Sequence, residues 1–201
     1  MPSPRTSSLA PLLAALALAA LLTVLLAACS AGASGSFDPS GPCTTDGKAP
    51  GAYPDLEARI PKTYEGQGPV SVDSGRHCSP ANLGSLAAAG ISELRYAGGT
   101  WGFGGDRAAV LVVFEADGLT ADLIANYYAS SARAADRTRI TGQSSPTLAG
   151  RPGHRLDTET GDRTQTVVVW PSTYPDIVDV VITNELPDPK IQSAVDAFGG
   201  R

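Results

Sequence analysis

The sequence predicts an α+β fold in which one mostly antiparallel sheet is flanked by helices, as an α/β/α sandwich in a single domain. Three observations support this class. Residues 108–114 form an entirely apolar run bounded by polar turns, which is typical of a strand covered on both faces. Residues 119–134 repeat apolar side chains at helical spacing. Three strand patterns joined by short turns then follow between residues 154 and 183, which favours an antiparallel meander.

The elements before the apolar run are shorter. Residues 56–61 alternate apolar and polar side chains and end at a proline, which predicts a first strand. Residues 79–89 predict a small helix that Gly90 closes, and residues 91–96 predict a second strand. Residues 98–105 are mostly glycine and predict a long hairpin loop before the apolar strand.

The second half of the chain is more regular. Thr120 is placed to cap the helix over residues 119–134. The meander strands are expected over residues 154–158, 164–170 and 177–183, and in the last of them alternate side chains share one face. A closing helix over residues 190–198 would present its apolar side chains to the sheet.

The first residues of the sequence predict a leader. Residues 1–8 are polar with one cation, Arg5, and residues 9–28 are almost entirely apolar. That length is close to the roughly 20 residues that span a bilayer, so an uncleaved transmembrane anchor is the alternative to a signal peptide. Two small residues directly before Cys29, and a following segment without basic residues, favour cleavage.

The motif Leu26-Ala27-Ala28-Cys29 resembles the lipobox of bacterial lipoproteins. The resemblance implies that residues 1–28 are a lipoprotein signal peptide and that the sulfur of Cys29 receives a diacylglyceryl group. Cys29 would then become the acylated first residue, anchored on the extracytoplasmic side of the cell membrane. Stable anchoring takes at least two acyl chains, because each buried methylene contributes only about 0.8 kcal/mol. A diacylated or triacylated Cys29 meets that requirement.

Residues 29–53 are rich in Gly, Ser, Pro and Ala and predict a flexible linker before a domain over residues 54–201. If Cys29 is lipidated, Cys43 and Cys78 are left, and an oxidising compartment would join them in a disulfide. Two free thiols are the alternative. A catalytic thiol at Cys78 is disfavoured, because its neighbour His77 is adjacent in sequence and adjacent side chains rarely point at each other.

The domain is similar to the PsbP-like group of small α/β/α sandwiches, which includes LpqN-type lipoproteins of actinobacteria. Three segments carry the resemblance: residues 56–61 as a first strand ending in Ile-Pro, the helix over residues 119–134, and residues 149–156, which read Ala-Gly-Arg-Pro-Gly-His-Arg-Leu. Together with the terminal helix, the resemblance covers residues 54–199. The group is mostly non-enzymatic, with accessory or binding subunits, and implies no shared catalytic residues.

The sequence contains few residues in patterns that indicate catalysis or metal binding. The net charge is −5 and no basic run exists, so the sequence does not predict nucleic-acid binding. His77, expected in a surface loop, and His154, expected on an edge strand, are the only histidines, and no zinc-ligand spacing surrounds them. Glu115 and Asp117 are interpreted as solvated turn acids. No G-x-S-x-G turn, the usual site of a serine nucleophile, is present. From these observations together we expect no catalytic residues, no metal and no cofactor.

Trp101 and Phe103, held among glycines, are the candidate contact residues. In one interpretation Trp101 folds back over the core, and in the other an exposed aromatic tip binds a ligand or partner.

The sequence therefore predicts a lipid-anchored protein with a non-catalytic binding or scaffolding domain. The expected partner is an envelope protein or a small apolar ligand. A carrier of a lipid or other apolar ligand is the first alternative, and it requires a cavity of several hundred cubic ångströms between sheet and helices. Clustered alanines, among them Ala132 and Ala135, would leave such room or equally pack closely. A hydrolase is the second alternative, and it requires a serine or carboxylate beside His77 or His154 in a cleft.

Overall fold

The computed structural model describes residues 37–199. The predicted signal peptide, Cys29 and the first part of the predicted linker lie outside the described residues. The described residues belong to one compact unit that begins at Phe37.

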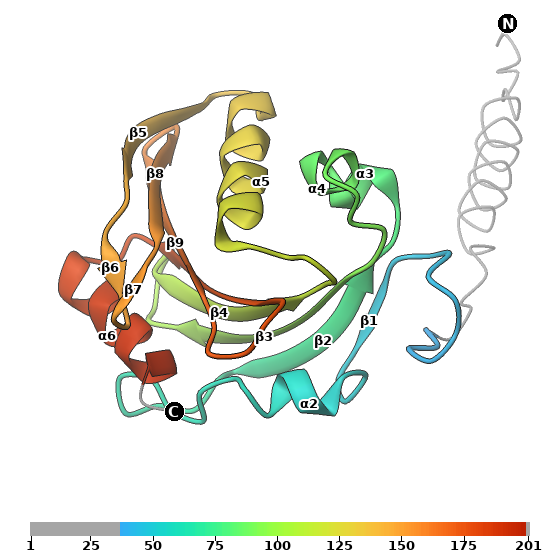
Figure 1. Ribbon diagram of the computed structural model, residues 1–201. Helices are drawn as coiled ribbons and strands as arrows, with labels where there is room; N and C mark the ends of the chain where they lie inside the picture. The colour runs from blue at the N-terminus through green and yellow to red at the C-terminus, as the bar shows by residue number, and fades with distance from the viewer. Residues whose placement is uncertain (1–36, 200–201) are drawn as a thin grey trace, which may run out of the picture. The chain divides into compact units, whose positions relative to one another are not determined.

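An eight-stranded sheet organises the molecule, and every neighbouring pair of its strands is antiparallel (Figure 1). In spatial order the strands are β1 (Gly47–Ala49), β2 (Ser71–His77), β3 (Leu94–Gly102), β4 (Ala108–Glu115), β10 (Ile177–Asn184), β9 (Arg163–Pro171), β8 (His154–Thr160) and β5 (Thr138–Ser144). A separate small hairpin joins β6 (Thr147–Leu148) to β7 (Arg151–Pro152). The predicted antiparallel α+β class and the meander β8–β9–β10 are confirmed.

Helices cover both faces of the sheet. On one face lie α3 (Pro80–Leu83), α4 (Ser85–Ala88) and α5 (Ala121–Ala134), and on the other lie α2 (Pro54–Glu57) and α6 (Asp188–Gly199) (Figure 1). Each face has its own cluster of buried apolar side chains. The sheet therefore separates two cores, as expected for an α/β/α sandwich.

The central strands supply side chains to both cores. In β4, Leu111 and Val113 face α6, whereas Val112 and Phe114 face α5. This two-sided burial explains why the strand is apolar at consecutive positions from Ala108 to Phe114 rather than at alternate ones. Helix α5 begins as predicted, because the Thr120 hydroxyl accepts a hydrogen bond of 3.3 Å from the backbone N–H of Leu123.

Residues 56–61 do not form a strand, which corrects the sequence prediction. Pro54 at the first helical position and acidic side chains in the first turn favour a helix start, and α2 forms there. Leu56 and Ile60 are both buried against the α6 side of the sheet. Their spacing suits a helical turn as well as an alternating strand, so the sequence pattern was ambiguous.

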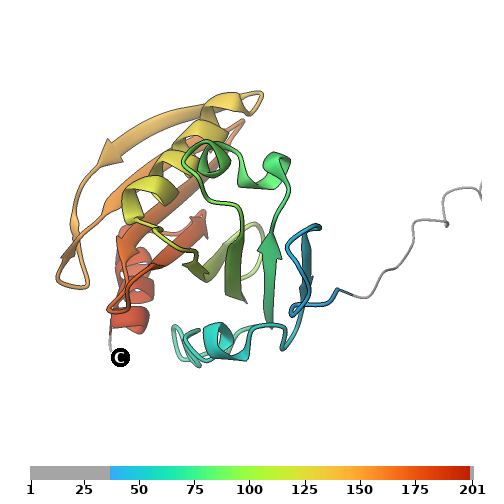
Figure 2. The same cartoon turned by 45° about the vertical axis from the view of Figure 1, so that its right-hand side comes forward.

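Residues 37–53 are not a free linker, which corrects the predicted domain boundary at residue 54. Strand β1 pairs with β2 at one edge of the sheet (Figure 2). Gly75 permits this approach, because a Cβ atom there would lie 2.3 Å from the carbonyl oxygen of Gly47.

The glycine-rich stretch is also more ordered than predicted. β3 continues through Gly102, so only residues 103–107 form the hairpin loop to β4. Gly99 is required inside this strand, since a Cβ atom there would lie 2.7 Å from Ile60 and 2.9 Å from the Trp101 indole. The expected helix over residues 79–89 is likewise two short helices, which meet at Gly84, with a φ of 51°.

Candidate functional site

A pocket of about 510 Å³ lies between the C-terminal half of α5 and the ends of β8, β9 and β10. We call it the α5 pocket. Its wall on the helix includes Tyr128, Ser131 and Ala132, and Leu156 and Val167 contribute apolar surface from the sheet. Ala132 and Ala135 line it. Small side chains at these positions leave room between helix and sheet, which the carrier alternative requires.

The α5 pocket presents neutral hydroxyl groups. Thr138 and Thr160 line it and join their Oγ1 atoms across 2.8 Å. Burial raises the pKa of the Tyr128 phenol, and the neighbouring Tyr127 raises it further, so Tyr128 stays neutral at physiological pH. Hydroxyls both donate and accept hydrogen bonds, so they match ligand groups of either kind.

The charged groups at the rim of the α5 pocket are already paired. Arg163 lies 3.1 Å from the carboxylate of Asp106. The Glu185 carboxylate accepts a hydrogen bond from the backbone N–H of Thr164. The pocket is therefore suited to an uncharged ligand more than to an ion.

His154 lies in a neighbouring pocket of about 480 Å³, between the N-terminal half of α5 and the β5–β8 edge. Its Nε2 atom is 2.7 Å from Oδ1 of Asp122, and Ser144 and Ser145 line the same pocket. The Asp122 side chain is 77% exposed. Within residues 37–199, no serine hydroxyl is hydrogen-bonded to an imidazole. The carboxylate that the hydrolase alternative required is thus present beside His154, but none of the described serine hydroxyls is hydrogen-bonded to this imidazole and so activated by it.

The two histidines differ from their predicted placements. His154 begins β8, which pairs with β9 on one side and with β5 on the other, so the strand is not at the edge of the sheet. His77 ends β2, is half-buried and stacks on the Tyr96 ring with centroids 4.9 Å apart. Burial lowers the pKa of His77 although Asp46 opposes this, so the imidazole stays neutral at physiological pH.

Trp101 is 1% exposed, which excludes it as an exposed contact residue. Its indole N–H donates to the carbonyl oxygen of Gln67 at 2.9 Å, and Tyr64 packs edge-on at 5.9 Å between ring centroids. Phe103 is half-buried against the same core and lies under Lys190, whose Nζ is 4.6 Å from the ring centroid. These aromatic side chains stabilise the α6 side of the sheet rather than forming a binding tip.

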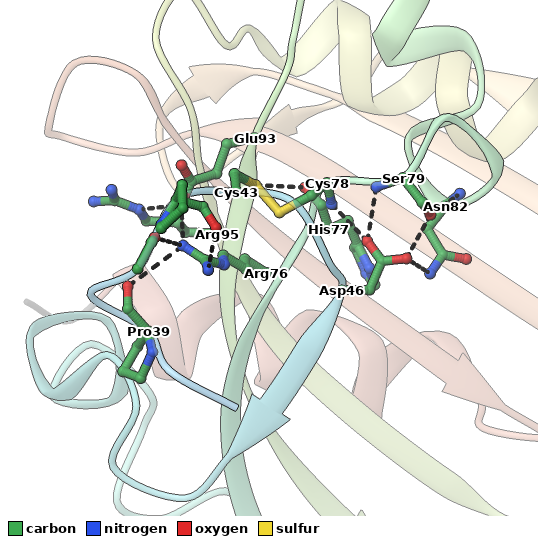
Figure 3. The surroundings of a disulfide bond; sticks show 12 residues. Pro39, Cys43, Asp46, Arg76, His77, Cys78, Ser79, Asn82, Glu93 and Arg95 are labelled. Atoms are coloured by element: carbon green, nitrogen blue, oxygen red, sulfur yellow. Dashed lines mark hydrogen bonds and ion pairs between the residues drawn. A yellow bond between two sulfur atoms is a disulfide. The ribbon is translucent and has the colours of Figure 1, made fainter. Parts of the chain in front are cut away.

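Cys43 and Cys78 form the predicted disulfide, with Cα atoms 5.4 Å apart (Figure 3). Beside it, Arg76 is 3% exposed, and its guanidinium points at the loop over residues 38–42. It donates to the carbonyl oxygens of Gly41 at 2.8 Å, Pro42 at 3.0 Å and Asp38 at 3.1 Å. Nothing in the local sequence around Arg76 indicated this role.

Asp46 provides the second link between this segment and the domain. Its carboxylate accepts hydrogen bonds from the backbone N–H groups of Cys78 and Ser79, the Ser79 hydroxyl and the Asn82 side chain (Figure 3). Burial raises the Asp46 pKa, but these hydrogen bonds outweigh it and bring the pKa down to about 2. We call the disulfide, Arg76 and Asp46 together the N-terminal clamp.

Neither a metal site nor a membrane-spanning helix is found among residues 37–199. No group of three or more His, Cys, Asp or Glu side chains could hold a metal ion. No helix in this range is long and apolar enough to cross a membrane. Glu115 ends β4 and Asp117 lies exposed in the turn that follows.

No known protein-family profile matches this chain, and no curated protein resembles it in sequence.

Proposed function

We propose that this chain is an extracytoplasmic lipoprotein, anchored through Cys29, whose domain binds a ligand in the α5 pocket without catalysis. The observation that carries the binding role is the pocket of about 510 Å³ under α5. Its size lies within the roughly 300–1,000 Å³ that is usual for small-molecule sites. The Cys43–Cys78 disulfide supports export, because disulfides persist in oxidising compartments.

The lining favours a carrier over a pure scaffold. Ala132, Leu156 and Val167 offer apolar contact, and the hydroxyls around them offer orientation without charge. A neutral or amphiphilic small molecule fits this combination. We also propose that the domain is PsbP-like. The α/β/α layering supports this, whereas α2 replaces the strand that the resemblance expected at its start.

The anchor is tested by metabolic labelling with palmitate in a bacterium that processes lipoproteins. We expect the wild-type protein to incorporate label and to fractionate with membranes, and Cys29→Ala to lose both properties. Equal labelling of the two proteins, or none in either, contradicts the anchor.

The pocket is tested by native mass spectrometry of the protein released from its membrane. We expect a small-molecule adduct on the wild type that Ala132→Phe removes, because the new ring would occupy the pocket. The matched control is Ala134→Phe, since Ala134 is exposed on the same helix and does not line the pocket. An adduct that survives Ala132→Phe, or is absent from the wild type, contradicts the proposal.

Hydrolysis is the second candidate, and the His154–Asp122 contact is the observation that favours it. A fluorophosphonate probe labels an activated serine covalently. Labelling that depends on His154 and on Ser144 or Ser145 would establish a hydrolase and replace the non-catalytic proposal.

A further inference from the structure

A pocket of about 380 Å³ lies on the α6 side of the sheet, and two arginines line it. Arg59 follows α2, and Arg151 begins β7. Within the described part of the chain neither guanidinium lies within ion-pair distance of a carboxylate, although Asp55 and Asp179 line the same pocket. Asp179 has an interaction of its own. By contrast, arginines on the eight-stranded sheet, such as Arg76 and Arg155, have carboxylate partners.

Arg59 is held in place from one side by an aromatic ring. Its guanidinium carbon lies 3.8 Å from the centroid of the Tyr174 ring, a stacking distance at which cation–π attraction is strong. Tyr174 is itself 54% exposed, which is unusual for a large apolar side chain in this molecule. Because a stacked guanidinium keeps its in-plane N–H groups for other partners, the stack orients Arg59 without satisfying its hydrogen bonds.

The unpaired state of Arg59 carries a free-energy cost. Its Nε atom is buried and has no hydrogen-bond acceptor. Buried polar groups are nearly always satisfied, and a charged donor without an acceptor is costly. An anion bound to the Nη–H groups would offset the charge of the guanidinium, although the buried Nε–H itself would stay without an acceptor.

The remaining lining suits a small polar solute. Ser172 and Thr173 add hydroxyls from the β9–β10 connection, and the backbone N–H of Ser172 is fixed on the carbonyl of Ile177 at 3.0 Å. Ala58 and Ala149, which are at least partly exposed, contribute apolar surface. The pocket thus combines two unpaired cations, two hydroxyls and an apolar wall.

We propose that this pocket binds an oxyanion, the carboxylate or phosphate group of a small solute, between Arg59 and Arg151. Arginine is the side chain best matched to either group, because its planar fork donates two parallel hydrogen bonds. The flanking Asp55 and Asp179 weaken the field for a polyanion, so a singly charged group is favoured over a highly charged one. The site lies across the sheet from the α5 pocket, and its test is independent of the function proposed above.

The test titrates the full domain with inorganic phosphate and, in a second arm, with acetate, while the arginine Nε–H signals are followed by NMR. We expect Arg59 and Arg151 to shift and saturate in at least one arm, and the arm that saturates at lower concentration identifies the preferred group. Arg59→Gln and Arg151→Gln should each weaken binding at least about tenfold, the effect of losing one charge-assisted hydrogen bond. Arg133→Gln, on the exposed surface of α5, should leave binding unchanged.

A thermal denaturation curve of each variant shows that it is folded. If Arg59→Gln does not fold, Arg151→Gln decides, because Arg151 lies on the small hairpin outside the main sheet. The proposal is overturned if neither anion shifts the two arginines. It is also overturned if Arg133→Gln weakens binding as much as the pocket variants do, since the effect would then reflect net charge alone.

Discussion

Removing the Cys43–Cys78 disulfide should destabilise the domain by about 4 kcal/mol. The bond joins residues separated by 35 positions. In the chain-entropy description, closing a loop of that length lowers the entropy of the unfolded chain by about 13 cal/mol/K, or about 3.8 kcal/mol at 25 °C. The Cα atoms are 5.4 Å apart, well inside the usual range for disulfides, so backbone spacing gives no reason to reduce the value.

The native fold should survive this change. Arg76 and Asp46 still hold the segment before β2 through hydrogen bonds that do not involve sulfur. The loss should therefore appear in global unfolding, and β1 should stay paired with β2. With a urea slope of about 2 kcal/mol per molar, the unfolding midpoint should fall by about 2 M.

The assay is urea unfolding followed by the fluorescence of Trp101 and Trp170, both buried in the folded domain. The variant is Cys43→Ser with Cys78→Ser, and both proteins also carry Cys29→Ala so that no other thiol can pair. Reduced wild-type protein should match the double variant. An unchanged midpoint, or loss of hydrogen-exchange protection in β1 alone, would refute the reasoning, because the clamp would then act only locally.

Three further changes test the contacts described above. Asp46→Asn should remove a stabilisation that is complete above the ordinary carboxyl pKa of 3.8 and is lost as the pH falls through about 2. The melting temperatures of wild type and variant should therefore converge between pH 4 and pH 2. Melting temperatures that differ by the same amount at every pH would contradict this. Gly75→Ala should destabilise by about 1–3 kcal/mol and expose β1 to proteolysis, because the new Cβ would meet the carbonyl of Gly47; a neutral effect in chemical unfolding would show that β1 moves aside without cost. Thr120→Ala should cost about 1 kcal/mol in the same assay by removing the α5 cap, and Thr120→Ser should restore most of it; equal loss in both variants contradicts capping.

The regular elements could be predicted because their signals are local. The apolar run of β4 reflects burial on both faces, and the helical spacing of α5 and α6 reflects burial on one. The α2 segment could not be assigned, since Leu56 and Ile60 satisfy both the helical and the alternating pattern. Gly98 and Gly99 indicated a loop because glycine weakens strands. Gly99 is necessary in β3 because of the Trp101 indole and of Ile60, which is distant in sequence, and neither contact can be inferred from the local pattern.

The binding features were less accessible to sequence reasoning. The alanines that line the α5 pocket were visible as a cluster, but whether they leave space or pack closely depends on the helix-to-sheet distance. Arg59 and Arg151 are far apart in sequence, and they line one pocket because the end of α2 and the β6–β7 hairpin both border it. Arg76 donates hydrogen bonds to backbone carbonyl oxygens. Every residue type has such an oxygen, so the sequence does not indicate these contacts.

The N-terminal clamp changes what the lipid anchor would do. A linker over residues 29–53 would let the domain move far from the membrane, whereas the compact unit that holds the sheet already includes residues from Phe37 onward. If Cys29 is the anchor, eight Cα-to-Cα steps join it to Phe37, and at about 3.6 Å per step this length of chain can span at most about 29 Å. A compact unit of this size has a radius of gyration of about 15 Å, so the domain could not stand off the bilayer by more than its own diameter. Energy transfer from a dye at Ser40 to acceptor-labelled lipids should therefore be strong in the acylated protein, and a flexible insertion of about 25 residues after Ser34 should weaken it. Transfer that is equally weak in both proteins would show that the N-terminal segment does not hold the domain near the membrane.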